Sequence, residues 1–182
     1  MQLRNNTERY GLLSIGLHWL MLLLFIAVYA CIELREFFPK DSEPREALKT
    51  WHFMLGLSVF VLVWLRLLVN RLGHHPRIEP ELPTWQQQSA KVMHVALYGL
   101  MIFMPLAGWL ILSASGKVVP FFGLQLPPLM GESKNVADFI KEIHETVGTL
   151  GYFLIGLHAA AELIHHYFLG DNTLKRILPN RD

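Results

Sequence analysis

The chain has 182 residues, of which 52% are hydrophobic and only 17% are charged, and its formal net charge is +1. Soluble globular proteins carry about 25% charged residues, so the composition favours lipid as the main solvent, and the near-neutral balance excludes the basic field of a nucleic-acid-binding protein. The single cysteine, Cys31, excludes an internal disulfide and a cysteine-based metal cluster, and the lack of a Cys-x-x-Cys-His motif excludes covalent attachment of a c-type haem.

The first predicted element is a membrane-spanning helix over residues 11–34. The stretch from Tyr10 to Ile32 contains no charged residue, and a spanning helix needs about 20 apolar residues. This apolar run is longer than the core of a signal peptide, which has about 7–15 residues. We therefore expect the segment to be retained as the first span.

Three further spans are predicted, over residues 50–70, 91–114 and 144–168. The second is interrupted by Arg66 and the fourth by Glu162, and the third contains Pro105, which a bundle tolerates where neighbouring helices satisfy the freed carbonyl. Residues 116–131 are rich in proline and glycine and are predicted to form a loop at the membrane interface. The sequence therefore predicts one all-α integral membrane domain over residues 1–182, a four-helix bundle in a lipid bilayer.

The distribution of basic residues predicts the orientation of this bundle. An even number of spans places both chain ends on the same side of the membrane. Lysine and arginine number nine on the side of the terminal segments and the second connection, against seven in the first and third connections. The positive-inside rule therefore predicts cytoplasmic N- and C-termini.

Four histidines fall on the predicted spans at paired depths. His144 and His158 are fourteen residues apart, which is about 21 Å of helix and nearly a whole number of turns, so both rings share one helix face. With the termini inside, His52 is level with His144 in the outer half, and His18 is level with His158 in the inner half. Imidazole is a normal axial ligand of haem iron, and a bundle interior is a normal cofactor site. The pattern predicts two bis-histidine sites, each holding one haem b.

The residues alone leave other assignments open. A zinc ion needs three or four ligands around one centre, whereas these histidines divide into two levels, and any single histidine could instead bond a neighbouring helix. His94 is roughly level with His18 and could replace it as an axial ligand, line a quinone site or lie among the headgroups. Arg66 could pair with a haem propionate or extend to the cytoplasmic surface. Glu162 could accept a proton during quinone reduction or pair with a base at the interface.

The remaining polar residues are predicted to be solvated. His74 and His75 lie in a polar loop, and His165 and His166 are expected at the surface near the end of the fourth span. Basic residues that could attract a small anion alternate with acidic ones in the outer connections, which favours a mixed-charge solvated surface: Arg35, Lys40, Arg45, Lys49 and Lys117. Four glycines could admit a flat ring or serve helix packing: Gly16, Gly56, Gly148 and Gly151.

Four stretches carry a family resemblance: SIGLHWLMLLLFIAVYA, REFFPK, HETVGTLGYFLIGLHAAAELIHHYF and DNTLKRILP. Over essentially its whole length the chain resembles the bacterial cytochrome b561 proteins, small diheme b-type cytochromes of the inner membrane. The family's four ligand positions match His18, His52, His144 and His158. The resemblance pairs the first and second spans each with the fourth, which favours His18 over His94.

The resemblance implies an activity that the residues themselves do not show. The bacterial branch is linked to oxidation of superoxide, with electrons passed to ubiquinone, so a superoxide:ubiquinone oxidoreductase is the leading hypothesis. The wider family includes cytochrome b subunits of membrane hydrogenases and formate dehydrogenases, which implies an electron-transfer subunit with a redox partner protein as the alternative. A structural membrane protein without haem is the third hypothesis, and the catalytic residues are not identified.

Overall fold

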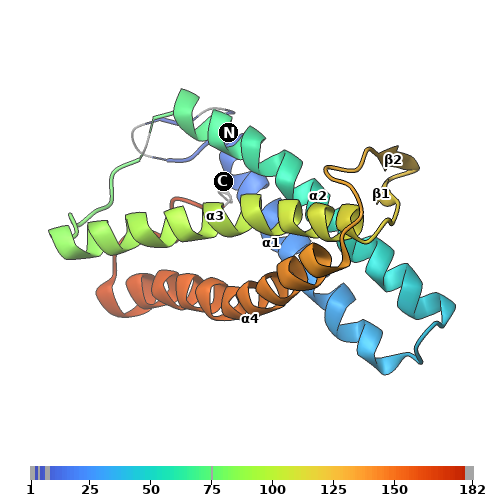
Figure 1. The fold of residues 1–182 in the computed structure, drawn as a ribbon. Helices are drawn as coiled ribbons and strands as arrows, with labels where there is room; N and C mark the ends of the chain where they lie inside the picture. The colour runs from blue at the N-terminus through green and yellow to red at the C-terminus, as the bar shows by residue number, and fades with distance from the viewer. Residues whose placement is uncertain (1–2, 4, 7–8, 75, 179–182) are drawn as a thin grey trace.

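The structure is a computed structural model that describes residues 3, 5–6, 9–74 and 76–178. This part of the chain forms four long helices with a small hairpin between the last two (Figure 1). The elements are α1 (Leu12–Leu34), η1 (Arg35–Phe37), α2 (Glu43–Leu72), α3 (Thr84–Ala114), β1 (Val119–Phe121), β2 (Leu124–Leu126), α4 (Lys134–Ile164) and η2 (His165–Leu169). All four α-helices are long and apolar enough to cross a membrane, which confirms the predicted all-α membrane bundle.

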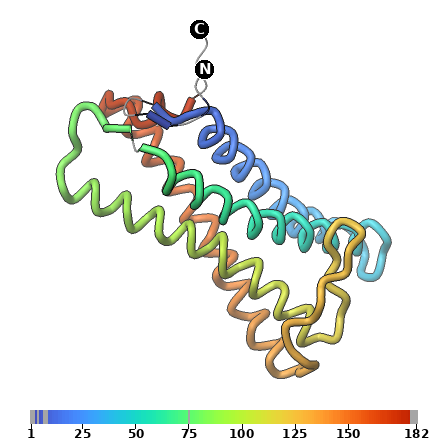
Figure 2. The backbone as a smooth tube through the Cα atoms, turned by 90° about the horizontal axis from the view of Figure 1, so that it is seen from above, coloured from blue at the N-terminus to red at the C-terminus, as the bar shows by residue number. Residues whose placement is uncertain are grey.

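Successive helices alternate in direction, so the bundle has two distinct ends (Figures 1 and 2). The start of α1, the connection from α2 to α3 and the end of α4 lie together, and we call this the terminal end. The connection from α1 to α2, the β1–β2 hairpin and the start of α4 lie at the opposite end, which we call the hairpin end.

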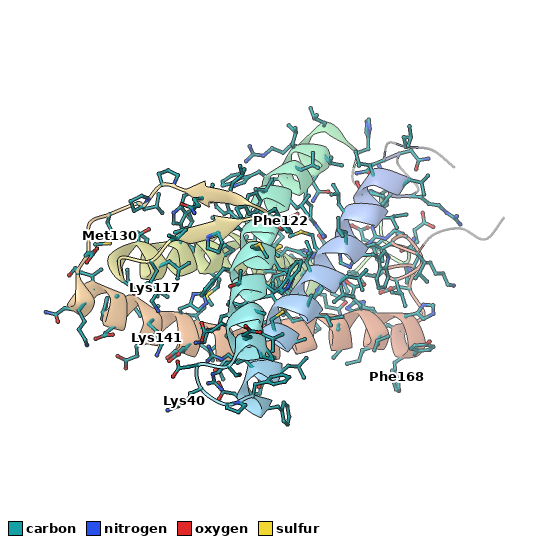
Figure 3. All side chains as sticks on the ribbon, turned by 90° about the vertical axis from the view of Figure 1, so that its right-hand side faces the viewer. Lys40, Lys117, Phe122, Met130, Lys141 and Phe168 are labelled. Atoms are coloured by element: carbon teal, nitrogen blue, oxygen red, sulfur yellow. The ribbon has the colours of Figure 1, made fainter. Side chains whose placement is uncertain are left out.

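The helices form two pairs that cross, and Figure 3 shows α1 and α2 running steeply across α4. α1 packs along α2, α2 along α3, and α3 along α4. By contrast, within the described helices no Cα atom of α4 comes within 8 Å of one in α1 or α2. The bundle therefore has an open seam between α4 and the α1–α2 pair, and only side chains reach across it.

The apolar core is built almost without α4. One buried cluster joins the first three helices and consists of Met21, Val59, Val63 and Met101. A second joins α2, α3 and the hairpin and consists of Leu57, Leu112 and Val119. In α4 the buried residues are Ala137 and Gly151, both small. The fourth helix is therefore held mainly through α3 and through contacts across the seam.

Three helices begin before their predicted spans, and the predicted interfacial loop contains two strands. α2 begins at Glu43 and α3 at Thr84, whereas the predicted spans begin at residues 50 and 91. α4 begins at Lys134, well before the predicted span, because ion pairs one turn apart support a polar helix: Lys134 with Asp138 at 2.6 Å and Lys141 with Glu145 at 3.2 Å. Hydropathy detects only the apolar part of such a helix.

The predicted interfacial loop contains an antiparallel hairpin, in which Val119 pairs with Leu126 and Phe121 with Leu124. Its turn places Phe122 and Gly123 at positive φ. The Phe122 N–H lies 3.4 Å from the Met54 sulfur, which fastens the turn to α2. Figure 3 labels Phe122 on this hairpin.

The segment after α4 folds back and closes the terminal end. The Asn172 N–H donates to the carbonyl of Glu79 at 3.1 Å, and the Glu79 N–H donates to the Asn172 side-chain oxygen at 3.0 Å. The Trp19 indole N–H donates to the carbonyl of Ile177 at 3.0 Å. The side chain of Asp171 is only 1% exposed and pairs with the ring of His165. The last segment therefore joins α1 and the α2–α3 connection.

The pairing of Asp171 predicts a loss of this closure in acid. Burial opposes ionisation of the carboxyl group, but hydrogen bonds from His165 and Thr173 outweigh burial and hold the pKa of Asp171 below its ordinary value of 3.8. Because the pKa of Asp171 is lowered by folding, its ionised carboxylate stabilises the folded segment at pH values above the ordinary pKa. This stabilisation is lost as the pH falls through the lowered pKa of the folded state. Between about pH 6 and about pH 3, the protection of residues 171–178 against hydrogen exchange, relative to the intrinsic rate at each pH, should fall. Asp171→Asn should show low protection at both pH values, and equal protection of the native segment at both would contradict the prediction.

Candidate functional site

Two pairs of imidazole rings face each other across the seam. The rings of His52 on α2 and His144 on α4 have centroids 6.3 Å apart with an interplanar angle of 75°, and we call them the hairpin-end pair. The rings of His18 on α1 and His158 on α4 are also 6.3 Å apart, at 67°, and we call them the terminal-end pair. The fold therefore brings together the four predicted ligand positions as two separate pairs.

The separation of the rings fits one metal ion between the members of each pair. An imidazole nitrogen lies about 2 Å from a bound metal ion, so two nitrogens on opposite sides are about 4 Å apart, and the ring centres are farther apart by a ring radius at each side. Centroid distances of 6.3 Å agree with this arrangement. No cluster of three or more histidine, cysteine or acidic side chains suited to a metal ion occurs among the described residues.

His52 is held in a tautomer that leaves Nε2 available to a metal ion. Its Nδ1 lies 3.0 Å from the carbonyl oxygen of Val28 on α1. Because a carbonyl oxygen only accepts, Nδ1 carries the proton and the lone pair of Nε2 points elsewhere. A histidine ligand that donates its other N–H to a carbonyl is the usual outer-shell arrangement in metal sites.

The space around the hairpin-end pair accommodates a flat group. Gly56 follows His52 by one turn of α2, and a Cβ added there would meet no atom within 4 Å. The Nδ1 atom of His144 is buried without a hydrogen-bond partner among the described residues, and a buried polar atom of this kind commonly marks a functional site. The open seam and these two features fit a porphyrin held between the rings.

Gly16 and Gly151 contribute differently from Gly56. Gly16 is exposed and lies two residues before His18, so its Cα faces roughly the opposite side of α1. A Cβ on Gly151 would collide with the hydroxyl of Tyr29. Gly151 therefore supports close packing across the seam, which is the alternative that the sequence left open.

The terminal-end pair has two additional polar neighbours. The ring of His94 on α3 lies 5.7 Å from that of His158, so geometry alone does not choose between His18 and His94 as its partner. The Arg66 guanidinium lies 2.9 Å from Nδ1 of His18. Because arginine only donates, Nδ1 accepts here and the proton of the neutral ring is on Nε2. For Nε2 to coordinate a metal ion, the proton must move to Nδ1, and the hydrogen bond from Arg66 to Nδ1 must break.

Other candidate residues lie outside the two pairs. Glu162 is half-buried one turn beyond His158, within electrostatic range of Arg176 and His165. His165 is partly exposed near the end of α4, and its ring pairs with Asp171. His74 is exposed, and the prediction for His75 lies outside the described residues.

The charged surface at the hairpin end is largely paired. Glu36 accepts from Arg35 at 3.0 Å and from Arg45 at 3.1 Å, and Glu46 accepts from Lys49 at 2.5 Å. Figure 3 labels three further lysines of this region, Lys40, Lys117 and Lys141. The pairs agree with the mixed-charge solvated surface that the sequence favours.

The fold and the facing imidazoles agree with the class of b-type membrane cytochromes. A family model described as prokaryotic cytochrome b561 matches residues 9–180. A relative named cytochrome b561 homolog 1, from Escherichia coli K12, is 39% identical over 96% of this chain and 99% of its own. A probable superoxide oxidase, CybB, from Yersinia pestis is 38% identical over 96% and 98%, and cytochrome b561 homolog 2 of Escherichia coli K12 is 27% identical over 98% and 95%.

The chain belongs to the prokaryotic cytochrome b561 family, and the resemblance seen in the sequence is confirmed. It is therefore a multi-pass protein of the bacterial inner membrane with b-type haem, and it carries out electron transfer of the cytochrome b561 type.

Contacts across the seam predict an unusual response to alanine at Gly151. Glycine to alanine within a helix normally stabilises by about 0.5–1 kcal/mol. At Gly151 the new methyl group would displace the Tyr29 hydroxyl, which donates to the carbonyl of Gly148, at a cost of about 1 kcal/mol. Thermal unfolding should therefore show no gain for Gly151→Ala, whereas Gly156→Ala, where a Cβ meets no atom within 4 Å, should unfold at a higher temperature. An equal gain for both variants would contradict the packing described.

Proposed function

We propose that the protein binds two haems b and transfers electrons across the membrane from superoxide to ubiquinone. The observation that carries the proposal is that two facing imidazole pairs share one helix, α4, whose two imidazoles are separated by about 21 Å of helix. The name of the Yersinia pestis relative, a probable superoxide oxidase, supports the choice of electron donor.

The proposed ligands are His52 with His144 at the hairpin end and His18 with His158 at the terminal end. Haem iron supplies a one-electron couple when it is bound. The Val28 carbonyl orients His52. Arg66 lies beside the terminal-end pair, so its guanidinium could exchange its hydrogen bond with His18 for an ion pair with a haem propionate. His94 then remains a neighbour of His158 rather than a ligand, in agreement with the family's ligand positions.

The proposed orientation places the terminal end in the cytoplasm and the hairpin end in the periplasm. The excess of basic residues on the terminal side supports it. Superoxide then gives up its electron at the hairpin end, and ubiquinone is reduced near the terminal-end pair. Two superoxide ions lose one electron each and become dioxygen, while one quinone takes up both electrons and two protons and becomes the quinol.

The ligand assignment predicts the haem content of a histidine variant. The purified protein should contain about two b-type haems per chain, and His144→Ala should lose one of them, because His52 would lack its partner across the seam. Absorption spectra with haem quantitation measure this. His74→Ala removes an exposed imidazole and should keep both haems. Full retention of haem by His144→Ala would refute the assignment.

The reaction itself can be tested with the protein in liposomes that contain ubiquinone. Superoxide generated outside should be consumed with formation of one quinol for two superoxide ions, and this coupling should be lost in His144→Ala. Haem reduction that occurs only after addition of a dehydrogenase or hydrogenase would instead favour an electron-transfer subunit.

A further inference from the structure

A pair of tyrosines bridges the open seam beside the hairpin-end pair. The Tyr29 hydroxyl on α1 donates to the carbonyl of Gly148 on α4 at 2.9 Å. Gly148 lies one turn from His144, so this hydrogen bond attaches α4 to α1 close to the imidazole. The Cα atoms of the two helices stay more than 8 Å apart. The side chain of Tyr29 therefore spans a gap that backbone packing does not close.

The same turn of α1 holds the other ring of this pair. Val28, directly before Tyr29, accepts the hydrogen bond from Nδ1 of His52. Two consecutive residues of α1 thus contact opposite sides of the hairpin-end site. The Val28 carbonyl accepts from His52 on α2, and the Tyr29 hydroxyl donates to α4 one turn from His144. α1 supplies no imidazole to this pair.

A second tyrosine keeps Tyr29 in place. The ring of Tyr152 on α4 packs against that of Tyr29 with centroids 4.2 Å apart. Its hydroxyl donates to a carboxylate oxygen of Glu33 on α1 at 2.6 Å, a length typical of a charge-assisted hydrogen bond. Gly151, on the same side of α4, leaves the room that the Tyr29 hydroxyl occupies.

We propose that Tyr29, supported by Tyr152 and Glu33, is a positioning residue that sets the distance between His52 and His144 and so controls how tightly the hairpin-end haem is held. This inference rests on the proposed ligation of that haem. Without the hydroxyl, α4 is free to move from α1 near Gly148, and the pocket admits water. Water favours the charged ferric form, so the reduction potential of that haem falls.

The test uses the haem-loaded protein and the variant Tyr29→Phe, which keeps the ring and removes one hydroxyl. Two haems should remain bound. Transfer of the hairpin-end haem to apomyoglobin should become roughly two- to tenfold faster, which is the effect of one lost hydrogen bond. In a redox titration the component absent from His144→Ala should shift to lower potential, and the other component should not move.

Two further variants keep the test specific. Tyr152→Phe leaves Tyr29 intact and should produce a smaller shift of the same component in the same direction. Tyr98→Phe is the matched control, because its hydroxyl accepts from the Asn70 side chain at 2.8 Å between α3 and α2 near the terminal end. It should leave the hairpin-end component unchanged.

The outcomes separate this inference from the proposed function. If His144→Ala removes one haem but Tyr29→Phe leaves both the release rate and the potential of that haem unchanged, the positioning role is wrong and the haem assignment stands. A shift of the terminal-end component alone would also overturn the role. If His144→Ala removes no haem, the ligand assignment itself fails.

Discussion

The structure depends on the distance between α4 and the α1–α2 pair. Elsewhere the helices pack directly, with apolar side chains of α1, α2 and α3 meeting in a common core. α4 contributes only small buried residues and stays more than 8 Å, Cα to Cα, from α1 and α2. A helix so placed needs some other group to fill the space beside it, and the two imidazole pairs mark where that group would lie.

The two ends of the seam differ in their polar surroundings. At the hairpin end His52 and His144 have backbone and tyrosine neighbours, and the surface charges above them form ion pairs. At the terminal end, in contrast, His158 faces two other imidazoles and Arg66 lies against His18. The hairpin-end site thus has neutral partners, whereas the terminal-end site has a cation and a third imidazole beside it, to which a negatively charged group could bind.

Periodicity and depth were enough to predict the membrane bundle and the pairing of histidines, because both follow from the regular rise of a helix. They could not separate His18 from His94, since both residues lie at the same depth and the choice depends on how the helices cross. The bonds from Tyr29 to Gly148 and from Tyr152 to Glu33 were missed for the same reason. The early start of α4 was missed because its first turns are polar, and the pairing of His165 with Asp171 depends on the fold of the last segment.

The near absence of α4 from the apolar core has a consequence for biogenesis. The first three helices and the hairpin already share two buried clusters, so they can associate in the membrane as soon as they are inserted. The last helix packs on α3 and reaches α1 and α2 only through side chains across the seam. Under the proposed haem ligation, the groups held between the imidazole pairs would add the remaining contacts of α4 with α1 and α2, so completion of the bundle would follow cofactor supply.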